Sequence, residues 1–288
     1  MLYLLNKDKF ECKDGRLHIL DLQKENPSKI RLSPTEMFSI IAPAGEKDET
    51  DKNEFITWMK KFDLVGEKSD PFYLDNGKAL QPKITTAIEA YLGQKLVLEK
   101  PVSNDFLSGR MDAVYEEDTK KSPVIEVKTF CTDKLFGYMH DGEWILERDP
   151  NTNKVLVDEP GVKIKEKDWA LYKKRKGEVI FKGWQISPDK AEYMYQLQTY
   201  LYLTNKENGV FYVCFYGAND IYNIDNFQLR IGVDENCNLV PIEMTRDPEF
   251  VEKIETAKKW YDEHITTGIS PLMTKQDMIW YESQVKQR

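Results

Sequence analysis

The sequence has few of the residues that build zinc or iron–sulfur centres. Its three histidines are scattered, no CxxC pair occurs, and the four cysteines are widely separated: Cys12, Cys131, Cys214 and Cys237. Zinc ribbons and cysteine-ligated clusters need closely spaced thiolates. We therefore expect no iron–sulfur cluster, histidines in surface or packing roles, and free, mostly buried thiols, as in an intracellular protein.

Long apolar segments are also missing. The N-terminal apolar run is five residues long, and no cleavage signal follows it. No other run approaches the roughly 18 residues that a membrane span requires. These absences predict a cytoplasmic protein with no membrane partner. A composition of 41% hydrophobic and 31% charged residues is typical of a globular chain.

A positive net charge is missing too, since the formal net charge is -8. Nucleic-acid-binding proteins are usually basic, so the overall charge disfavours a polyanionic ligand. A bound phosphate, however, senses mainly the charges within about 8 Å at physiological salt. One stretch, residues 163–176, carries seven basic and two acidic residues with Trp169 and Tyr172 among them. It predicts a phosphate-binding surface; a solvated charged hairpin or helix is the alternative.

From residue 77 on, the sequence shows a regular order of elements. Apolar residues three and four apart predict a helix over 78–92, and Gly93 fits its end. A second helix begins at Ser187-Pro188-Asp189, with a hydroxyl N-cap and an early proline. Runs rich in β-branched and aromatic residues predict strands; these runs span residues 95–102, 106–116, 123–130, 209–217 and 226–234.

The order helix, strand, strand, strand, helix, strand indicates an α/β fold, with a central mixed sheet flanked by helices. Residues 1–76 are expected to form an N-terminal cap region, β-rich over 1–32 and helical from Ser33-Pro34. The remaining 77–288 form the main domain, which divides into a core of 77–130 and 187–234, an insertion of 131–186, and C-terminal helices over 247–288.

Three residues predict a metal-binding catalytic site. Glu126 and Lys128 are two apart on one predicted strand, so their side chains share a face, and Asp112 lies on the preceding strand. A hairpin between the strands brings Asp112 beside Glu126, and two close carboxylates repel unless a cation neutralises them. Mg²⁺ favours one or two carboxylates together with water and substrate phosphate. A nearby lysine can orient water or offset charge on phosphate. The alternative is that Glu126 and Lys128 simply face water.

The stretch SGRMDAVYE…VIEVKTF, followed by QLQTY, resembles the PD-(D/E)XK nuclease superfamily, in its RecB-like and lambda-exonuclease-like branch. Asp112, Glu126 and Lys128 match the D…ExK signature, with Met111 in place of the proline. Two further residues, four apart and hence on one helix face, match the QxxxY motif that follows in this branch: Gln196 and Tyr200. The resemblance covers about residues 77–217.

The resemblance implies a restriction-endonuclease-like core and Mg²⁺-dependent hydrolysis of DNA, with Mn²⁺ as a substitute. Asp112, Glu126 and the Val127 carbonyl would bind the metal, Lys128 would position or activate water, and the QxxxY pair would support the site or contact the DNA backbone. The family's first helix often carries GxxxE, whereas here Gly77 is followed by Gln81. Gln81 can still ligate through its carbonyl oxygen. Otherwise Glu89 substitutes for it, or the position binds no metal in this chain.

The substrate surface predicted from the sequence combines Arg110, beside the motif, with the basic insertion. The residues of the insertion expected to contact DNA are Trp169, Tyr172, Lys173, Lys174, Arg175 and Lys176. The basic side chains would contact phosphates and the aromatic ones would stack on bases.

The functional prediction is a Mg²⁺-dependent exonuclease acting in recombination, repair or phage-type DNA processing. A DNA endonuclease of the same superfamily is the near alternative. An alternative of another class is a catalytically weak DNA-binding or assembly module that retains the fold. DNA is the expected partner, and a homo-oligomer or a recombination or processing protein is left open. The sequence does not determine polarity, strand preference or sequence specificity.

Overall fold

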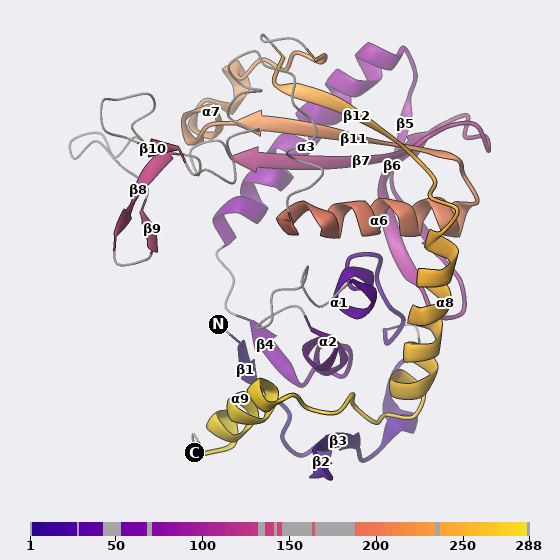
Figure 1. Ribbon diagram of the computed structural model, residues 1–288. Helices are drawn as coiled ribbons and strands as arrows, with labels where there is room; N and C mark the ends of the chain where they lie inside the picture. The colour runs from indigo at the N-terminus through magenta and orange to yellow at the C-terminus, as the bar shows by residue number, and fades with distance from the viewer. Residues whose placement is uncertain are drawn as a thin grey trace.

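The computed structural model describes residues 2–27, 29–42, 53–67, 71–131, 136–140, 143–145, 163–164, 188–233 and 237–286. Its centre is a five-stranded sheet in the order β12-β11-β7-β6-β5 (Figure 1). β7 and β11 are parallel, and the other neighbours are antiparallel. The strands are β5 (Leu96–Ser103), β6 (Ser108–Tyr115), β7 (Val124–Cys131), β11 (Asn208–Tyr216) and β12 (Leu239–Thr245).

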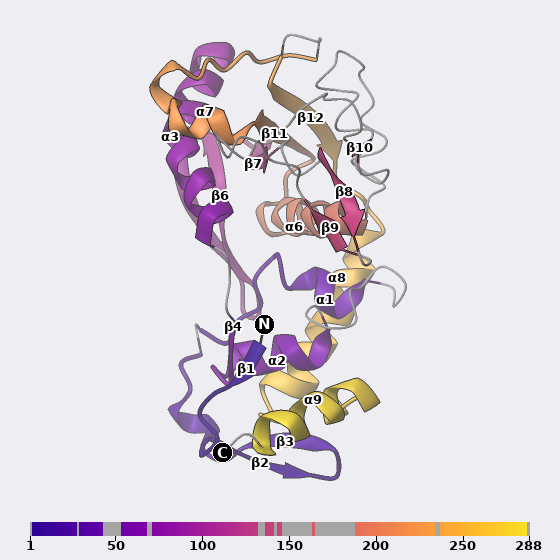
Figure 2. The same cartoon turned by 90° about the vertical axis from the view of Figure 1, so that its left-hand side faces the viewer.

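One long helix covers each face of this sheet, as Figure 2 shows edge-on. The helix α3 (Pro71–Leu92) packs Leu80 and its neighbours one turn apart against Ala113 and Ile125. The helix α6 (Pro188–Thr204) packs Leu197 and Leu201 against the other face. The predicted class, an α/β fold with a mixed sheet flanked by helices, is therefore confirmed.

The boundaries of both helices follow local chemistry. The start of α6 at Pro188 agrees with the prediction. The end of α3 at Leu92 also agrees, because Gly93 has φ +65°, a left-handed conformation that glycine adopts without strain. The beginning of α3 at Pro71 is seven residues before the predicted one, and the helix passes through Pro82.

The strand predicted over 226–234 is wrong. The 3₁₀ turn η5 (Ile224–Asn226) ends where this segment begins, and residues 227–233 then form an irregular chain. The Asn238 side chain accepts from the Arg230 N–H (2.9 Å) and donates to the Gln228 carbonyl (3.0 Å). The segment meets the sheet at one isolated bridge, Ile231 with Leu239, where the Gly232 N–H donates to the Leu239 carbonyl at 3.1 Å, and one bridge does not make a strand. The sheet instead continues with β12, which the sequence analysis did not predict. Its Pro241 lacks a backbone donor, which is tolerated on an edge strand.

The N-terminal region is β-rich over 1–32, as predicted, and then helical. The strand pairs are β1 (Leu2–Leu4) with β4 (Val65–Glu67) and β2 (Phe10–Lys13) with β3 (Arg16–Ile19). The helices are α1 (Met37–Ile41) and α2 (Glu54–Lys61). The helix predicted from Ser33-Pro34 begins only at Met37. Residues Ser33 and Glu36 close a turn first: the Glu36 N–H donates to the Ser33 carbonyl at 3.0 Å, and the Ser33 N–H donates to Glu36 Oε2 at 2.6 Å.

The C-terminal helices pack on the N-terminal region. These are α8 (Phe250–Trp260), the π turn η6 (Tyr261–Ile265) and α9 (Lys275–Lys286), close to the predicted ranges. Buried residues such as Phe250, Trp260 and Ile265 share one cluster with Leu17, Trp58 and other residues from the first 65. Packing thus joins the two ends of the chain into one lower body (Figure 1), while the boundary after residue 76 stays a prediction.

This lower body also fixes the start of β6. The Leu32 N–H donates to the Phe106 carbonyl and the Ser108 N–H donates to the Leu32 carbonyl, both at 2.8 Å. Gly109 then lies so close to Pro34 and Tyr200 that an added Cβ would approach their atoms to 2.8 and 2.9 Å. A glycine is therefore required where the N-terminal region, β6 and α6 meet.

Smaller elements complete the described chain. A separate sheet of β8 (Phe136–His140), β9 (Glu143–Ile145) and β10 (Lys163–Ile164) comes from the insertion. The short helices are η1 (Leu22–Lys24) and α7 (Ala218–Tyr222). Within the described ranges, no helix is both long enough and apolar enough to cross a membrane.

Candidate active site

The candidate site lies where β6 and β7 separate. The two strands form one register pair among the described residues, Ala113 with Ile125, and this register places Asp112 opposite Glu126. Residues of β7 alternate between the two faces of the sheet: Ile125 packs toward α3, whereas Val124 packs toward α6. Glu126 and Lys128 therefore face α6.

The two carboxylates exchange hydrogen bonds with the opposite strand. The Val127 N–H donates to Asp112 Oδ2 at 2.7 Å, and the Asp112 N–H donates to Glu126 Oε1 at 3.4 Å. Each carboxylate thus takes the place of a backbone carbonyl in the ladder. Because the N–H and C=O of one strand residue point to the same side, the Val127 carbonyl is directed toward the same opening between the strands.

Glu126 is held in an unfavourable environment for a charge. Its side chain is completely buried, and this burial, with the charge of Asp112, raises the pKa of Glu126 to about 7, although Lys128 opposes the shift. Phe211 is its register partner on β11, and Phe211 and Val124 both belong to the apolar cluster under α6. A buried carboxylate of this kind stores electrostatic free energy that a cation would release.

Lys128 is fixed by three neighbours. Its Nζ lies 3.0 Å from Glu126 Oε2 and 3.0 Å from Gln196 Oε1, and it lies 5.1 Å from the centre of the Tyr193 ring. Burial alone would lower the pKa of Lys128, but the charges of Glu126 and Asp112 together with the hydrogen bond to Glu126 raise it. Lys128 is therefore a cation with its ammonium group aimed at the carboxylates.

The helix α6 supplies the other two motif residues. Gln196 accepts from Lys128, and the Tyr200 hydroxyl donates to the Arg110 carbonyl at 2.6 Å, two residues before Asp112. Burial and the charges of Glu126 and Asp112 raise the pKa of Tyr200, so it remains a neutral donor. The structure thus brings together Asp112, Glu126, Lys128, Gln196 and Tyr200.

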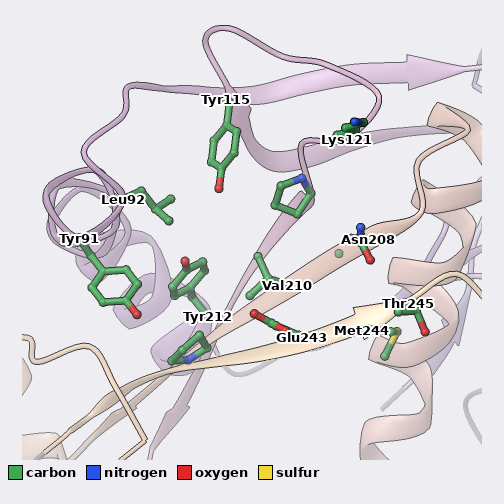
Figure 3. A pocket seen from close by; sticks show the side chains of 13 residues that line it. Tyr91, Leu92, Tyr115, Lys121, Asn208, Val210, Tyr212, Glu243, Met244 and Thr245 are labelled. Atoms are coloured by element: carbon green, nitrogen blue, oxygen red, sulfur yellow. The ribbon is translucent and has the colours of Figure 1, made fainter.

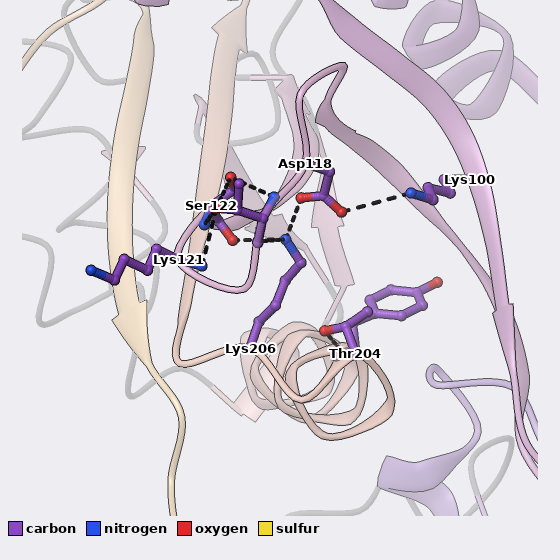
Figure 4. A network of polar contacts seen from close by, with 8 residues as sticks. Lys100, Asp118, Lys121, Ser122, Thr204 and Lys206 are labelled. Carbon is purple, nitrogen blue, oxygen red and sulfur yellow. Dashed lines mark hydrogen bonds and ion pairs between the residues drawn. The ribbon is translucent and has the colours of Figure 1, made fainter.

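The loop between β6 and β7 is tied to the end of α6 by Lys206 (Figure 4). The side chain of Lys206 is almost fully buried, and its Nζ donates to the Asp118 carboxylate and to the carbonyls of Thr119 and Ser122, the latter two at 2.9 Å. Asp118 also lies 3.7 Å from Lys100 of β5. This clamp fixes the hairpin that sets Asp112 opposite Glu126.

The sequence analysis missed both Lys206 and Tyr193. No sequence signal marks Lys206, because its partners lie more than 80 residues earlier in the chain. Tyr193 could have been found, since it lies three residues before Gln196 and hence on the same helix face.

The residues present fit a hard divalent cation. Mg²⁺ uses few carboxylates and keeps water and phosphate in its remaining positions, and here two opposed carboxylates and one backbone carbonyl converge. In the described part of the chain, no group of three or more His, Cys, Asp or Glu residues could form a larger metal site. Asp112, Glu126 and the Val127 carbonyl would hold such an ion.

Two other residues considered as metal ligands make no hydrogen bond with Asp112 or Glu126 within the described part of the chain. Gln81 lies on α3, over the opposite face of the sheet, and makes no hydrogen bond with Asp112 or Glu126 among the described residues. Glu89 accepts from the Leu96 N–H at 2.9 Å and from Lys95 at 3.0 Å, so it closes the turn after α3. Metal binding by Gln81 stays a prediction.

The predicted DNA-binding residues divide into two groups. Arg110 is exposed beside the site and pairs with Glu99 at 3.1 Å. An exposed pair of this kind is weak, so its guanidinium remains accessible to a phosphate. The others lie outside the described residues: Trp169, Tyr172, Lys173, Lys174, Arg175 and Lys176.

Comparisons with known proteins give the following. No family model matches the chain. It is 24% identical over 246 residues to uncharacterized protein MG373 of Mycoplasma genitalium, covering 80% of each chain, and 26% identical over 242 residues to the homolog in Mycoplasma pneumoniae, covering 78% of each.

Solved structures similar to the chain include two exonucleases. One is a phage-related exonuclease from Haemophilus somnus 129PT, with a TM-score of 0.49 and 15% identity over 82% of this chain and 95% of that chain. The other is the alkaline exonuclease LHK-Exo from Laribacter hongkongensis, with a TM-score of 0.46 and 12% identity over 90% and 95%. Because these identities are low, the roles of residues in this chain rest on its own geometry.

Proposed function

We propose that this chain is a Mg²⁺-dependent deoxyribonuclease, and more finely an exonuclease of recombination, repair or phage-type DNA processing. One observation carries the proposal: Asp112 and Glu126 are opposed across the opening of β6 and β7, with Lys128 bound to Glu126 at 3.0 Å. Two mutually repelling carboxylates, one completely buried, lower the stability of the protein alone. A cation bound between them would neutralise this repulsion, so the arrangement is that of a cation-binding site.

The chemistry follows from these groups. When bound, a divalent cation supplies positive charge beside the scissile phosphate and makes water easier to deprotonate. Asp112 and Glu126 hold the ion, and the charge of Lys128 stabilises the charge that develops on phosphate or orients the attacking water. Gln196 and Tyr193 restrict the Lys128 side chain to one position, so little reorganisation is needed. Tyr200 holds the backbone that carries Asp112.

A cleavage assay with two DNA forms tests the proposal. End-labelled linear DNA and covalently closed circular DNA are incubated with Mg²⁺ or Mn²⁺. We expect the linear form to be degraded from its ends while the closed circle persists, and EDTA to stop the reaction. Cleavage of the closed circle would identify an endonuclease instead. Absence of metal-dependent cleavage in both forms would contradict the proposed activity and leave a DNA-binding module.

The basic insertion gives a prediction about binding. Replacing Lys173, Lys174, Arg175 and Lys176 by serine should weaken DNA binding and reduce the salt slope of the binding constant by roughly one unit per lost phosphate contact. The measurement is the dissociation constant for linear DNA at several salt concentrations, with the metal omitted.

Single-turnover cleavage at saturating DNA serves as the control. Its rate should change much less, because Asp112, Glu126 and Lys128 remain. An affinity and a salt slope equal to those of the unmodified protein would show that the stretch is only a solvated face.

A further inference from the structure

A second cavity, of about 700 Å³, lies on the α3 face of the sheet, at the end of α3 and the beginning of β7 and β11 (Figure 3). The side chains of Glu126 and Lys128 face α6, on the other side of the same sheet. The cavity is therefore separate from the candidate active site. Its size falls within the roughly 300–1,000 Å³ of sites that bind small organic ligands.

Three tyrosines from three different elements converge on this cavity: Tyr91 at the end of α3, Tyr115 at the end of β6, and Tyr212 on β11 (Figure 3). Tyr212 is 3% exposed, whereas Tyr91 is 58% exposed at the mouth. Within the described chain, no aromatic ring contact involves any of the three. Tyr91, which is exposed, and Tyr115, which is half-buried, thus offer aromatic surface that suits a planar ligand, while the buried Tyr212 forms the base of the cavity.

Two groups of opposite charge and one neutral amide lie at different edges of the cavity. Glu243 comes from β12, Lys121 from the loop between β6 and β7, and Asn208 from the start of β11 (Figure 3). Among the described residues, the side chains of these three make no hydrogen bond or ion pair, nor do the tyrosine hydroxyls. Burial and the nearby Tyr115, Tyr91 and Glu243 raise the pKa of Tyr212 to about 12, so its hydroxyl is neutral.

We propose that this cavity binds a nucleobase with an exocyclic amino group, carrying a phosphate. The planar ring would lie against Tyr91 and Tyr115, its amino group would donate to Glu243, and the phosphate would lie at Lys121. Carboxylates accept from the amino group of cytosine in this way, and bases stack on aromatic side chains irrespective of sequence. The inference goes beyond the proposed nuclease activity and does not depend on it.

Other ligand classes use fewer of these features. An inorganic anion would be repelled by Glu243 and would leave the rings uncovered. An apolar ligand would bury Glu243 without a partner, which is costly. A nucleobase with a phosphate engages the rings, the carboxylate and the ammonium group together. Its source is either a free nucleotide or the end of a nucleic acid strand, and the experiment distinguishes the two.

The test is calorimetric titration of the full-length chain in EDTA, in an Asp112→Asn background that disables the candidate active site. The ligands are deoxycytidine monophosphate, thymidine monophosphate, inorganic phosphate and a short single-stranded oligocytidylate. We expect deoxycytidine monophosphate to bind about tenfold more tightly than thymidine monophosphate. Glu243→Gln should remove this preference, and Tyr91→Ala should weaken both nucleotides about tenfold.

The control variant is Tyr222→Ala, which removes a tyrosine 77% exposed on α7 and outside the cavity; it should bind like the parent. Glu243 and Tyr91 are exposed, and thermal unfolding verifies that each variant is folded. Cavity-dependent binding of the oligonucleotide alone assigns the site to a strand end, and binding of mononucleotides assigns it to free nucleotides. The proposal is overturned if no nucleotide or oligonucleotide binds. It is also overturned if Glu243→Gln and Tyr91→Ala both bind the nucleotides with the affinity and preference of the parent protein. If the cavity binds nucleotides but the unmodified protein does not cleave DNA, the proposed nuclease activity is wrong and the proposed nucleotide site stands.

Discussion

Replacing Asp112 by asparagine is expected to reduce Mg²⁺-dependent cleavage of linear DNA by about 10³-fold or more, about 4 kcal/mol of transition-state stabilisation. The substitution removes one of the two carboxylates that would hold the cation. The asparagine carbonyl can still accept from the Val127 N–H, which lies 2.7 Å from Asp112 Oδ2. The fold is therefore expected to remain, and the loss to be chemical. The measurement is the single-turnover rate at saturating DNA.

Two further variants sharpen this experiment. Asp112→Ala removes the acceptor as well, so it should lose a similar amount of activity and also about 1–3 kcal/mol of stability through the unpaired Val127 N–H. Asp105→Asn removes an exposed carboxylate from the turn before β6 and should leave cleavage unchanged. If Asp112→Asn cleaved DNA at a rate near that of the unmodified protein, Asp112 would have no part in binding the metal.

Replacing Glu126 by glutamine should abolish cleavage and at the same time stabilise the metal-free protein at pH 8. Burial and the charge of Asp112 raise the pKa of Glu126 from 4.5 to about 7. Between these two values the unfolded chain is ionised while the folded chain keeps its proton, so stability falls as pH rises from 4.5 to 7 and levels off above 7. Glutamine has no charge to desolvate. Its free energy of unfolding should be higher by about 1–3 kcal/mol at pH 8, with no gain at pH 4.5.

Urea unfolding in EDTA at both pH values measures this difference. Glu116→Gln is the matched control, because it replaces an exposed glutamate after the end of β6 and should not affect stability at either pH. Mg²⁺ should stabilise the unmodified protein, whose two carboxylates it neutralises, more than it stabilises Glu126→Gln. Two results would contradict the claim that ionised Glu126 destabilises the metal-free protein: a lower free energy of unfolding for Glu126→Gln at pH 8, or the same increase in that free energy at both pH values.

The elements of the core could be predicted because their signals are local. The apolar spacing and Gly93 predicted the end of α3, and Ser187-Pro188 predicted the start of α6. Alternation along β7 is a property of the strand itself, so Glu126 and Lys128 could be placed on one face from the sequence. In contrast, 226–234 has the composition of a strand, but the Asn238 side chain binds the backbone of Gln228 and Arg230, and the segment reaches the sheet at one isolated bridge, Ile231 with Leu239.

The sequence by itself thus determined the order of the core elements and which residues are able to perform metal-dependent chemistry. The hairpin predicted from the sequence brings Asp112 beside Glu126, but tertiary structure alone decided the register that sets the two residues opposite each other. It alone decided that Lys206 clamps the loop between their strands and that the C-terminal helices pack on the N-terminal region. It alone assembled the second cavity from four separate elements and a loop. The physical reason is separation along the sequence. Capping, helical periodicity and strand alternation depend on residues a few positions apart, whereas burial and electrostatic pairing depend on which distant segments come into contact.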